Sequence, residues 1–382
     1  MKQLLLLVTM MMLSMGAQAG NVLYAEIDGT SMTLKCGDSA PETSDVYIAT
    51  FHGHMDWNES YQRTITSVTI DASCQNYTGT TLAWLFGYCW KLKTITDLSN
   101  LNTANVSDMS SMFAACNNLT SIDLSGFNTE KVTDLGGMFT GCSSLTSLDL
   151  SGFNTSNVTN ISGMFRGCSS LTSLDLSGFN TANVKHMIEM FFACHSLISL
   201  DLSSFNTANV SGMSGMFGEC YALSSLNLSG WNTANVSDMG LLFSDCTSLT
   251  SLDLSSFNTT NVTQMGAMFW NCSSLKTIYV SNWDNGNLIT GGSNDMFYDC
   301  LNLVGGAGTV WSAENANDYT FACIDGGPEA PGYFTDIKAS GIKGLTIDKA
   351  EKNAPIYDLN GQQLSEPRKG INVIGGKKVL VK

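Results

Sequence analysis

The chain has 382 residues, of which 43% are hydrophobic and only 13% are charged, and its formal net charge is -15. Nucleic-acid binding and adsorption to an anionic membrane both need a basic surface, so this charge argues against both functions. The length exceeds what one compact core of ordinary size accommodates, whereas a repeat architecture lengthens its core with every unit.

The first 19 residues have the pattern of a secretory signal peptide. Lys2 gives the positive start, Leu4 to Leu13 give the apolar run, and residues 17–19 read Ala-Gln-Ala, a small-residue cleavage pattern. The alternative is a membrane anchor, but the run is shorter than the roughly 20 residues that a spanning helix needs. We therefore expect cleavage, and no transmembrane span after removal of the signal.

A 26-residue repeat occupies most of the remaining chain. Residues 145–170 read LTSLDLSGFNTSNVTNISGMFRGCSS, and the next 26 residues keep the pattern. A fixed period of this size is typical of a solenoid, in which each unit buries its apolar face against its neighbours. We expect a right-handed superhelix of about nine turns. The expected parts are an N-terminal β-rich cap at 20–64, the solenoid at 65–300 and a C-terminal cap at 301–334.

Each turn contains an L-x-x-L-x-L segment, which predicts a short strand and a leucine-rich-repeat-like, β-rich fold. Because side chains alternate along a strand, Ser147, Asp149 and Ser151 face outward in residues 145–151. The later Met-Phe-x-x-Cys segment predicts a short helical turn. The side chains expected in the core of this turn are Leu148, Leu150, Phe153, Val158, Met164, Phe165, Cys168 and Leu171.

Cysteines recur at the same position of successive turns. Disulfides are one interpretation for an exported chain, but stacked neighbours would lie about 5 Å apart with parallel Cβ vectors, too far for a disulfide. We expect buried free thiols that act as small hydrophobes. Seven members are spaced by one full period, namely Cys116, Cys142, Cys168, Cys194, Cys220, Cys246 and Cys272, and Cys89 and Cys300 extend the ladder to nine. The pairing of Cys36, Cys74 and Cys323, which lie outside it, stays open.

Asparagines form a second ladder with the same period. We expect their amides to stack, to bond along the solenoid axis and to satisfy turn backbone that would otherwise be buried unpaired. The members are Asn102, Asn128, Asn154, Asn180, Asn206, Asn232 and Asn258.

Aspartates recur at one outward strand position, and Asn227 fills the gap in their series. A row of carboxylates could supply oxygen ligands to Ca²⁺ or contact a cationic partner. The alternative, which we favour, is a solvated strand face. The members are Asp123, Asp149, Asp175, Asp201 and Asp253. We expect no metal, because the chain has no C-x-x-C zinc pattern. We expect no cofactor and no enzyme, since the chain lacks G-x-S-x-G and the glycine-rich phosphate-binding motifs.

The unit LTSLDLSGFNTxNVTxMxxMFxxCxxL resembles the repeats of BspA-type leucine-rich-repeat surface proteins of bacteria, over about Ile65 to Phe334. This resemblance implies an adhesin-like binding protein whose partner is a host matrix protein, a glycan or another bacterium. The exposed strand face around Ser147, Asp149 and Ser151 is then the candidate binding surface. The alternative is a structural envelope component without a specific ligand.

The last segment, residues 335–382, differs in charge from the rest. Residues 333–382 carry nine Lys and Arg against five Asp and Glu, whereas residues 1–332 carry nine against 28. We expect a small module of short strands with hairpin turns at Asn360-Gly361 and Gly375-Gly376. The segment resembles the C-terminal sorting segments of Bacteroidetes secreted proteins. That resemblance implies export by the type IX route and a location on the outside of the outer membrane.

Overall fold

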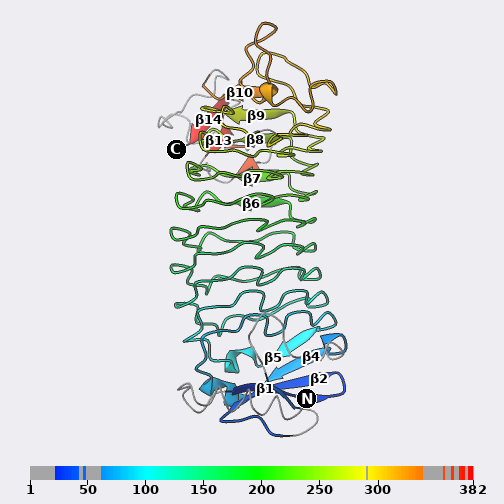
Figure 1. Ribbon diagram of the computed structural model, residues 1–382, viewed down its shortest axis with the longest axis vertical. Helices are drawn as coiled ribbons and strands as arrows, with labels where there is room; N and C mark the ends of the chain where they lie inside the picture. Colours follow the sequence, from blue (N-terminus) through cyan, green and yellow to red (C-terminus); the bar gives the residue numbers. More distant parts are fainter. Residues whose placement is uncertain are drawn as a thin grey trace.

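The computed structural model describes residues 22–42, 46–48, 62–289, 291–338, 356–357, 363–364, 370–374 and 377–381. The expected signal peptide and both expected hairpin turns of the tail lie outside these residues. The repeat forms one tall stack of turns, with the N-terminal strands at one end and β9 and β10 near the other (Figure 1). The expectation of a β-rich repeat fold is confirmed, whereas the handedness and the number of turns stay predictions.

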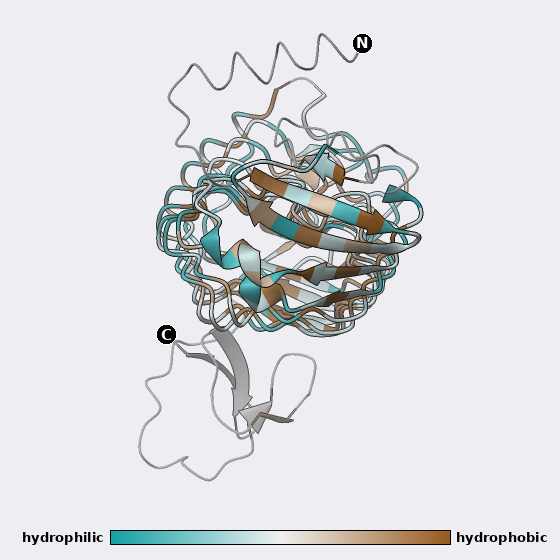
Figure 2. Cartoon of the chain, turned by 90° about the horizontal axis from the view of Figure 1, so that it is seen from below, coloured by the Kyte–Doolittle hydropathy of each residue, from teal (hydrophilic) through white to brown (hydrophobic). Residues whose placement is uncertain are grey.

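An N-terminal sheet lies across the first end of the stack, and hydrophobic and hydrophilic residues alternate along its strands (Figure 2). Its order is β3-β1-β2-β4-β5, so the hairpin β1–β2 joins the repeat where β2 pairs in parallel with β4. In β2, alternate residues Met32, Leu34 and Cys36 are buried. The elements are β1 (Val22–Asp28), β2 (Ser31–Gly37), β3 (Val46–Ile48), β4 (Ser67–Ile70), η1 (Ala72–Asn76), β5 (Thr94–Thr96) and η2 (Leu98–Asn100).

Strands of the repeat pair in parallel with an offset of one turn. Residues 199–201 pair with 225–227, and 251–253 pair with 277–279. The strands are β6 (Ser199–Asp201), β7 (Ser225–Asn227), β8 (Ser251–Asp253), β9 (Thr277–Val280) and β10 (Phe334–Asp336). Contrary to expectation, residues 119–124, 145–150 and 171–176 form no strand. Bonds on either side of residues 145–150, from Sγ of Cys142 to the carbonyl oxygen of Phe113 and from the amide of Asn154 to Oγ1 of Thr129, join this turn to the preceding one.

Ladders of identical side chains fill the core. Phe165 stacks on Phe139 with ring centroids 6.1 Å apart, and Phe217 stacks on Phe191 at 5.8 Å. Seven of the eight side chains expected in the core of the representative turn are buried. The expectation for Leu148 is wrong, because this side chain is only half-buried and packs against the edge of the core.

We call the segments that end in Met-Phe-x-x-Cys the turn face, namely residues 108–116 and their equivalents 26 residues apart, up to 264–272. The expected helical turn is wrong here. Ser111 and Ala115 have φ of 54° and 59°, in the left-handed region, which no right-handed helix contains. Amide N–H groups instead alternate between two kinds of bond. The amide of Phe113 donates to the carbonyl oxygen of Met138 in the next turn, whereas the amide of Cys116 donates locally to the carbonyl oxygen of Phe113.

The chain after the repeat folds back to pair β10 with β9. Asp325 is buried and accepts bonds from the amides of Ala307, Thr309 and Gly327, which fixes the glycine-rich segment around it. In the tail, four strands form an antiparallel sheet in the order β12-β11-β13-β14. The remaining elements are η3 (Tyr319–Phe321), β11 (Ile356–Tyr357), β12 (Gln363–Leu364), β13 (Gly370–Ile374) and β14 (Lys377–Val381). Within the described ranges, no helix is long and apolar enough to cross a membrane.

Candidate binding face

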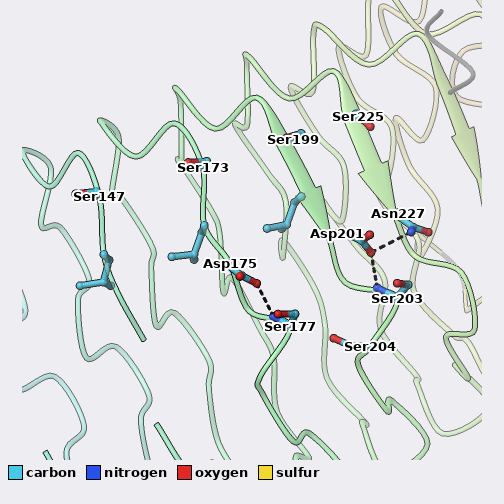
Figure 3. Close-up of a pocket in the computed structure, with 13 residues that line it drawn as sticks. Ser147, Ser173, Asp175, Ser177, Ser199, Asp201, Ser203, Ser204, Ser225 and Asn227 are labelled. Carbon is cyan, nitrogen blue, oxygen red and sulfur yellow. Dashed lines mark hydrogen bonds between the residues drawn. The ribbon is translucent and has the colours of Figure 1, made fainter. Parts of the chain in front are cut away.

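We call the outward side chains of the L-x-x-L-x-L segments the strand face, namely those of residues 121–125 and their equivalents up to 251–255. An open groove of about 600 Å³ crosses four consecutive turns of this face. Figure 3 shows a row of serines along it and a second row of acid and amide side chains beside the first. The rows consist of Ser147, Ser173, Ser199, Ser225, Asp175, Asp201 and Asn227.

The carboxylates of the strand face are held in place by their own backbone. Oδ1 of Asp149 accepts a bond from the amide of Ser151 at 2.9 Å, and Asp175 accepts the same bond from Ser177. These turns orient the side chains before any ligand arrives. The backbone and hydroxyl hydrogen bonds from Ser151 also hold the pKa of Asp149 below its usual value, so this carboxylate is charged at neutral pH.

Neighbouring turns bring these groups within bonding distance of each other. Nδ2 of Asn227 donates to Oδ1 of Asp201 at 2.9 Å, while Oδ1 of Asn227 accepts from the amide of Ser229. An asparagine therefore makes the same turn as an aspartate at this position. The natural replacement shows that a loss of charge here keeps the local geometry.

The groove contains only part of the expected set of site residues. Ser147, Asp175 and Asp201 line it, while Asp149 and Ser151 are exposed on the same face beside it. Asp123 is exposed one turn before the groove begins. Asp253 is half-buried beyond its far end, and burial raises the pKa of Asp253. The first four aspartates of the series are therefore exposed, whereas the last one, Asp253, is half-buried.

The ladder cysteines are buried free thiols. Sγ of Cys142 donates to the carbonyl oxygen of Phe113 in the preceding turn at 3.1 Å, and the later members repeat this contact. Burial raises the pKa of Cys142 and of Cys194 to about 12, which suppresses the reactive thiolate. Outside the ladder, Cys36 and Cys74 are buried and Cys323 is half-buried.

The expected bonding of the asparagine amides along the axis is wrong for Asn128 and its five successors up to Asn258. Their Oδ1 atoms accept bonds locally, from the amide two residues later, as Asn128 does from Glu130 at 3.0 Å. A second asparagine of the turn makes the axial bond instead. Nδ2 of Asn157 donates to the carbonyl oxygen of Glu130 in the preceding turn at 2.7 Å.

A ladder of buried threonines, which sequence reasoning missed, joins each turn from Thr103 to Thr259 to the turn that follows it. Oγ1 of Thr129 accepts from the amide of Asn154 at 2.7 Å and donates to the carbonyl of the same residue at 3.1 Å. The available signal was the Asn-Thr pair, whose threonine recurs as faithfully as the cysteine. The members are Thr103, Thr129, Thr155, Thr181, Thr207, Thr233 and Thr259.

Residues of the turn face and those directly after it form a cluster of large side chains that sequence reasoning also missed. Arg166 pairs with Glu189 at 2.8 Å and lies over the ring of Phe192 at 5.3 Å. In the next turns, His195 stacks on Tyr221 with centroids 4.8 Å apart. The signal was the stretch 185–195, in which bulky residues replace the small ones of the preceding turn. Among the described residues, no group of three or more His, Cys, Asp or Glu could hold a metal ion.

Three solved structures resemble the chain at low identity. A leucine-rich cell surface protein from Faecalibacterium prausnitzii is 18% identical, with 75% of this chain and 92% of that chain covered and a TM-score of 0.27. A leucine-rich repeat protein from Bacteroides ovatus is 19% identical, with coverages of 76% and 93% and a TM-score of 0.23. The functional domain of InlJ from Listeria monocytogenes, described as including a cysteine ladder, is 15% identical, with coverages of 62% and 66% and a TM-score of 0.16.

No curated protein matches the chain. A protein-family profile matches residues 80–200 and 192–311, which together span more than half of the chain and coincide with the stacked turns. The description of that family is "Mycoplasma protein of unknown function, DUF285". The chain therefore belongs to the DUF285 family.

Proposed function

We propose that the strand face binds an extracellular macromolecule in the manner of an adhesin: a host matrix protein, a glycan or the surface of another bacterium. The observation that carries this proposal is the groove of about 600 Å³, which presents serine and carboxylate or amide groups on successive turns. Because the same pattern repeats in line, individually weak contacts add along the array. We propose no catalytic role and no cofactor.

The chemistry of the groove favours a basic protein segment among these partners. Asp175 and Asp201 lie in adjacent turns, and both are fixed by bonds from the backbone. Carboxylates that are already oriented lose little freedom on binding, which leaves more of the interaction energy for affinity. Charge of one sign along a groove also steers an oppositely charged partner toward it.

The proposal places the protein outside the cell, on the bacterial surface. It is supported by the signal-peptide pattern of residues 1–19 and by the similarity of the tail to sorting segments of the type IX route. The alternative, a structural envelope component, predicts no saturable binding to any of the candidate partners.

The test compares the full chain with the triple variant Asp149→Asn, Asp175→Asn, Asp201→Asn for binding to immobilised matrix proteins, mucin and whole bacteria. We expect the parent chain to bind at least one of them, the triple variant to bind clearly less at low salt, and the difference to shrink as salt screens exposed charges. The melting temperature should hold, because Asn227 already makes the same turn.

The matched control removes three charges from another column of the same array. Asp108, Asp134 and Asp238 also accept a bond from the amide two residues later, but they lie on the turn face. Their triple replacement by asparagine should leave binding unchanged. Equal losses in both triple variants would show that only net charge matters, and binding of all three proteins alike would place the site away from the strand face.

A further inference from the structure

The outward positions of the strand face lose exposure toward the C-terminal end of the array. Asp149, Asp175 and Asp201 are exposed, whereas Asn227 and Asp253 are half-buried. At the next equivalent position stands Tyr279, which is only 4% exposed. The serine row changes in the same direction, from exposed at Ser199 to half-buried at Ser251.

The burial of Tyr279 is not explained by its place in the sheet. Its neighbour Ile278 is fully buried and faces the core, so alternation along β9 points Tyr279 outward. Asp253 and Thr335 flank Tyr279 in the adjacent strands, as the strand register shows. Flanking residues stand beside a ring rather than over it, so burial of this side chain requires a covering segment above the face.

We propose that the basic C-terminal module, residues 339–382, docks on this end of the strand face, over Asn227, Asp253 and Tyr279. The chain leaves the array from β10, whose Thr335 pairs beside Tyr279, so the module begins at the covered end. It carries eight Lys and Arg against four Asp and Glu, which complements the acidic face. The pKa values change along the strand face together with the exposure. Burial raises the pKa of Asp253, whereas hydrogen bonds from Ser177 lower the pKa of Asp175.

The docked module sets the length of the open groove. The groove extends from Ser147 to Asn227 and does not include Ser251 or Asp253, although both continue its pattern. A basic segment of the same chain thus occupies the acidic surface that an external partner would use. This inference concerns an intramolecular contact, and it holds or fails independently of the proposed partner.

The first test measures accessibility in the full chain with a cysteine at each of two equivalent positions. Asp253→Cys probes the covered end, and Asp149→Cys is the matched control in an open turn; both carry Cys323→Ser, which removes a half-buried native thiol. The buried ladder thiols react slowly in both proteins. We expect maleimide to modify the cysteine at 253 about tenfold or more slowly than the one at 149. Equal rates would overturn the proposal.

The second test identifies the covering segment in the parent sequence. A water-soluble carbodiimide activates the Asp253 carboxylate, a lysine amine displaces the activating group as a urea, and an amide bond joins the two residues. We expect mass spectrometry to find Asp253 joined to a lysine of residues 339–382 within one molecule, and Asp253→Asn to abolish that product. A link from Asp253 to any other segment, or links only between molecules in an isotope-mixed sample, would refute the assignment.

Discussion

The strand face and the turn face of the same array are held together in different ways. On the turn face, several backbone bonds join each turn to the next, as from Phe139 to Met164, and Asp108 adds a local bond by accepting from the amide of Ser110. On the strand face, three consecutive turns carry no strand. A repeating apolar pattern therefore specifies which side chains point inward, but it does not specify where the backbone pairs.

The pairing of the turn face depends on two residues in each turn, four positions apart, whose φ lies in the left-handed region. Gly163 and Gly167 take this conformation freely, but Glu189 and Ala193 adopt it as well, with φ of 52° and 58°. A residue with a Cβ pays about 1–2 kcal/mol for it. The bonds to the next turn offset that cost, so the position tolerates several residue types and leaves no signature in the sequence.

The largest loss of stability is expected at Phe191 of the turn face, and its neighbour Phe192 provides the matched control. Phe191→Ala should cost about 3–5 kcal/mol, because it leaves a cavity between the stacked rings of Phe165 and Phe217. Phe192→Ala removes a half-buried ring under Arg166 and should cost about 1 kcal/mol or less. Calorimetric melting of both variants checks the prediction, and similar losses would show that the core boundary is misplaced.

Hydrogen exchange compares the two faces directly within one turn. The amides of Phe139 and Gly141 bond to the next turn, whereas those of Ser147 and Asp149 make no backbone bond among the described residues. We expect the first pair to exchange at least about a hundredfold more slowly, a difference of about 2.8 kcal/mol. Equal protection at all four amides would mean that the strand face pairs in solution.

The threonine ladder predicts a smaller loss. Thr181→Val keeps the shape of the side chain but leaves the amide and carbonyl of Asn206 without their partner, so we expect a cost of about 1–3 kcal/mol. Thr181→Ser keeps the hydroxyl and should cost less, since it removes only one methyl group. Chemical denaturation of the two variants distinguishes the hydrogen bonds from the packing. A larger loss in the serine variant would contradict the assigned role.

The smallest effect lies in the titration of the strand face itself. Hydrogen bonds from Ser151 lower the pKa of Asp149, so its stabilisation is present above the pKa of the unfolded chain and is lost as pH falls through the folded pKa. Burial raises the pKa of Asp253, so charging this group opposes folding as pH rises. Carboxyl NMR should find Asp253 titrating above Asp149.

The repeat period was the part of the fold that residue patterns predict well. The spacing of Cys142 and Cys168 defined the turn, and alternation around Asp149 placed the outward residues of the strand face. The groove itself was not predictable, because the repeat pattern does not show which turns form strands or how far each outward side chain is exposed. The threonine ladder was hidden by composition, since Thr129 follows an asparagine and such pairs are typical of exposed turns.

One consequence of the bonds between turns is mechanical. Tension applied at the two ends of the stack acts along its axis, parallel to the bonds such as that between Phe113 and Met138. Each turn that detaches shortens the stack by about 4.8 Å. It also releases 26 residues of chain, which span about 90 Å when extended. A stretched array would therefore lengthen in discrete steps, absorbing work at each step while the remaining turns stay folded.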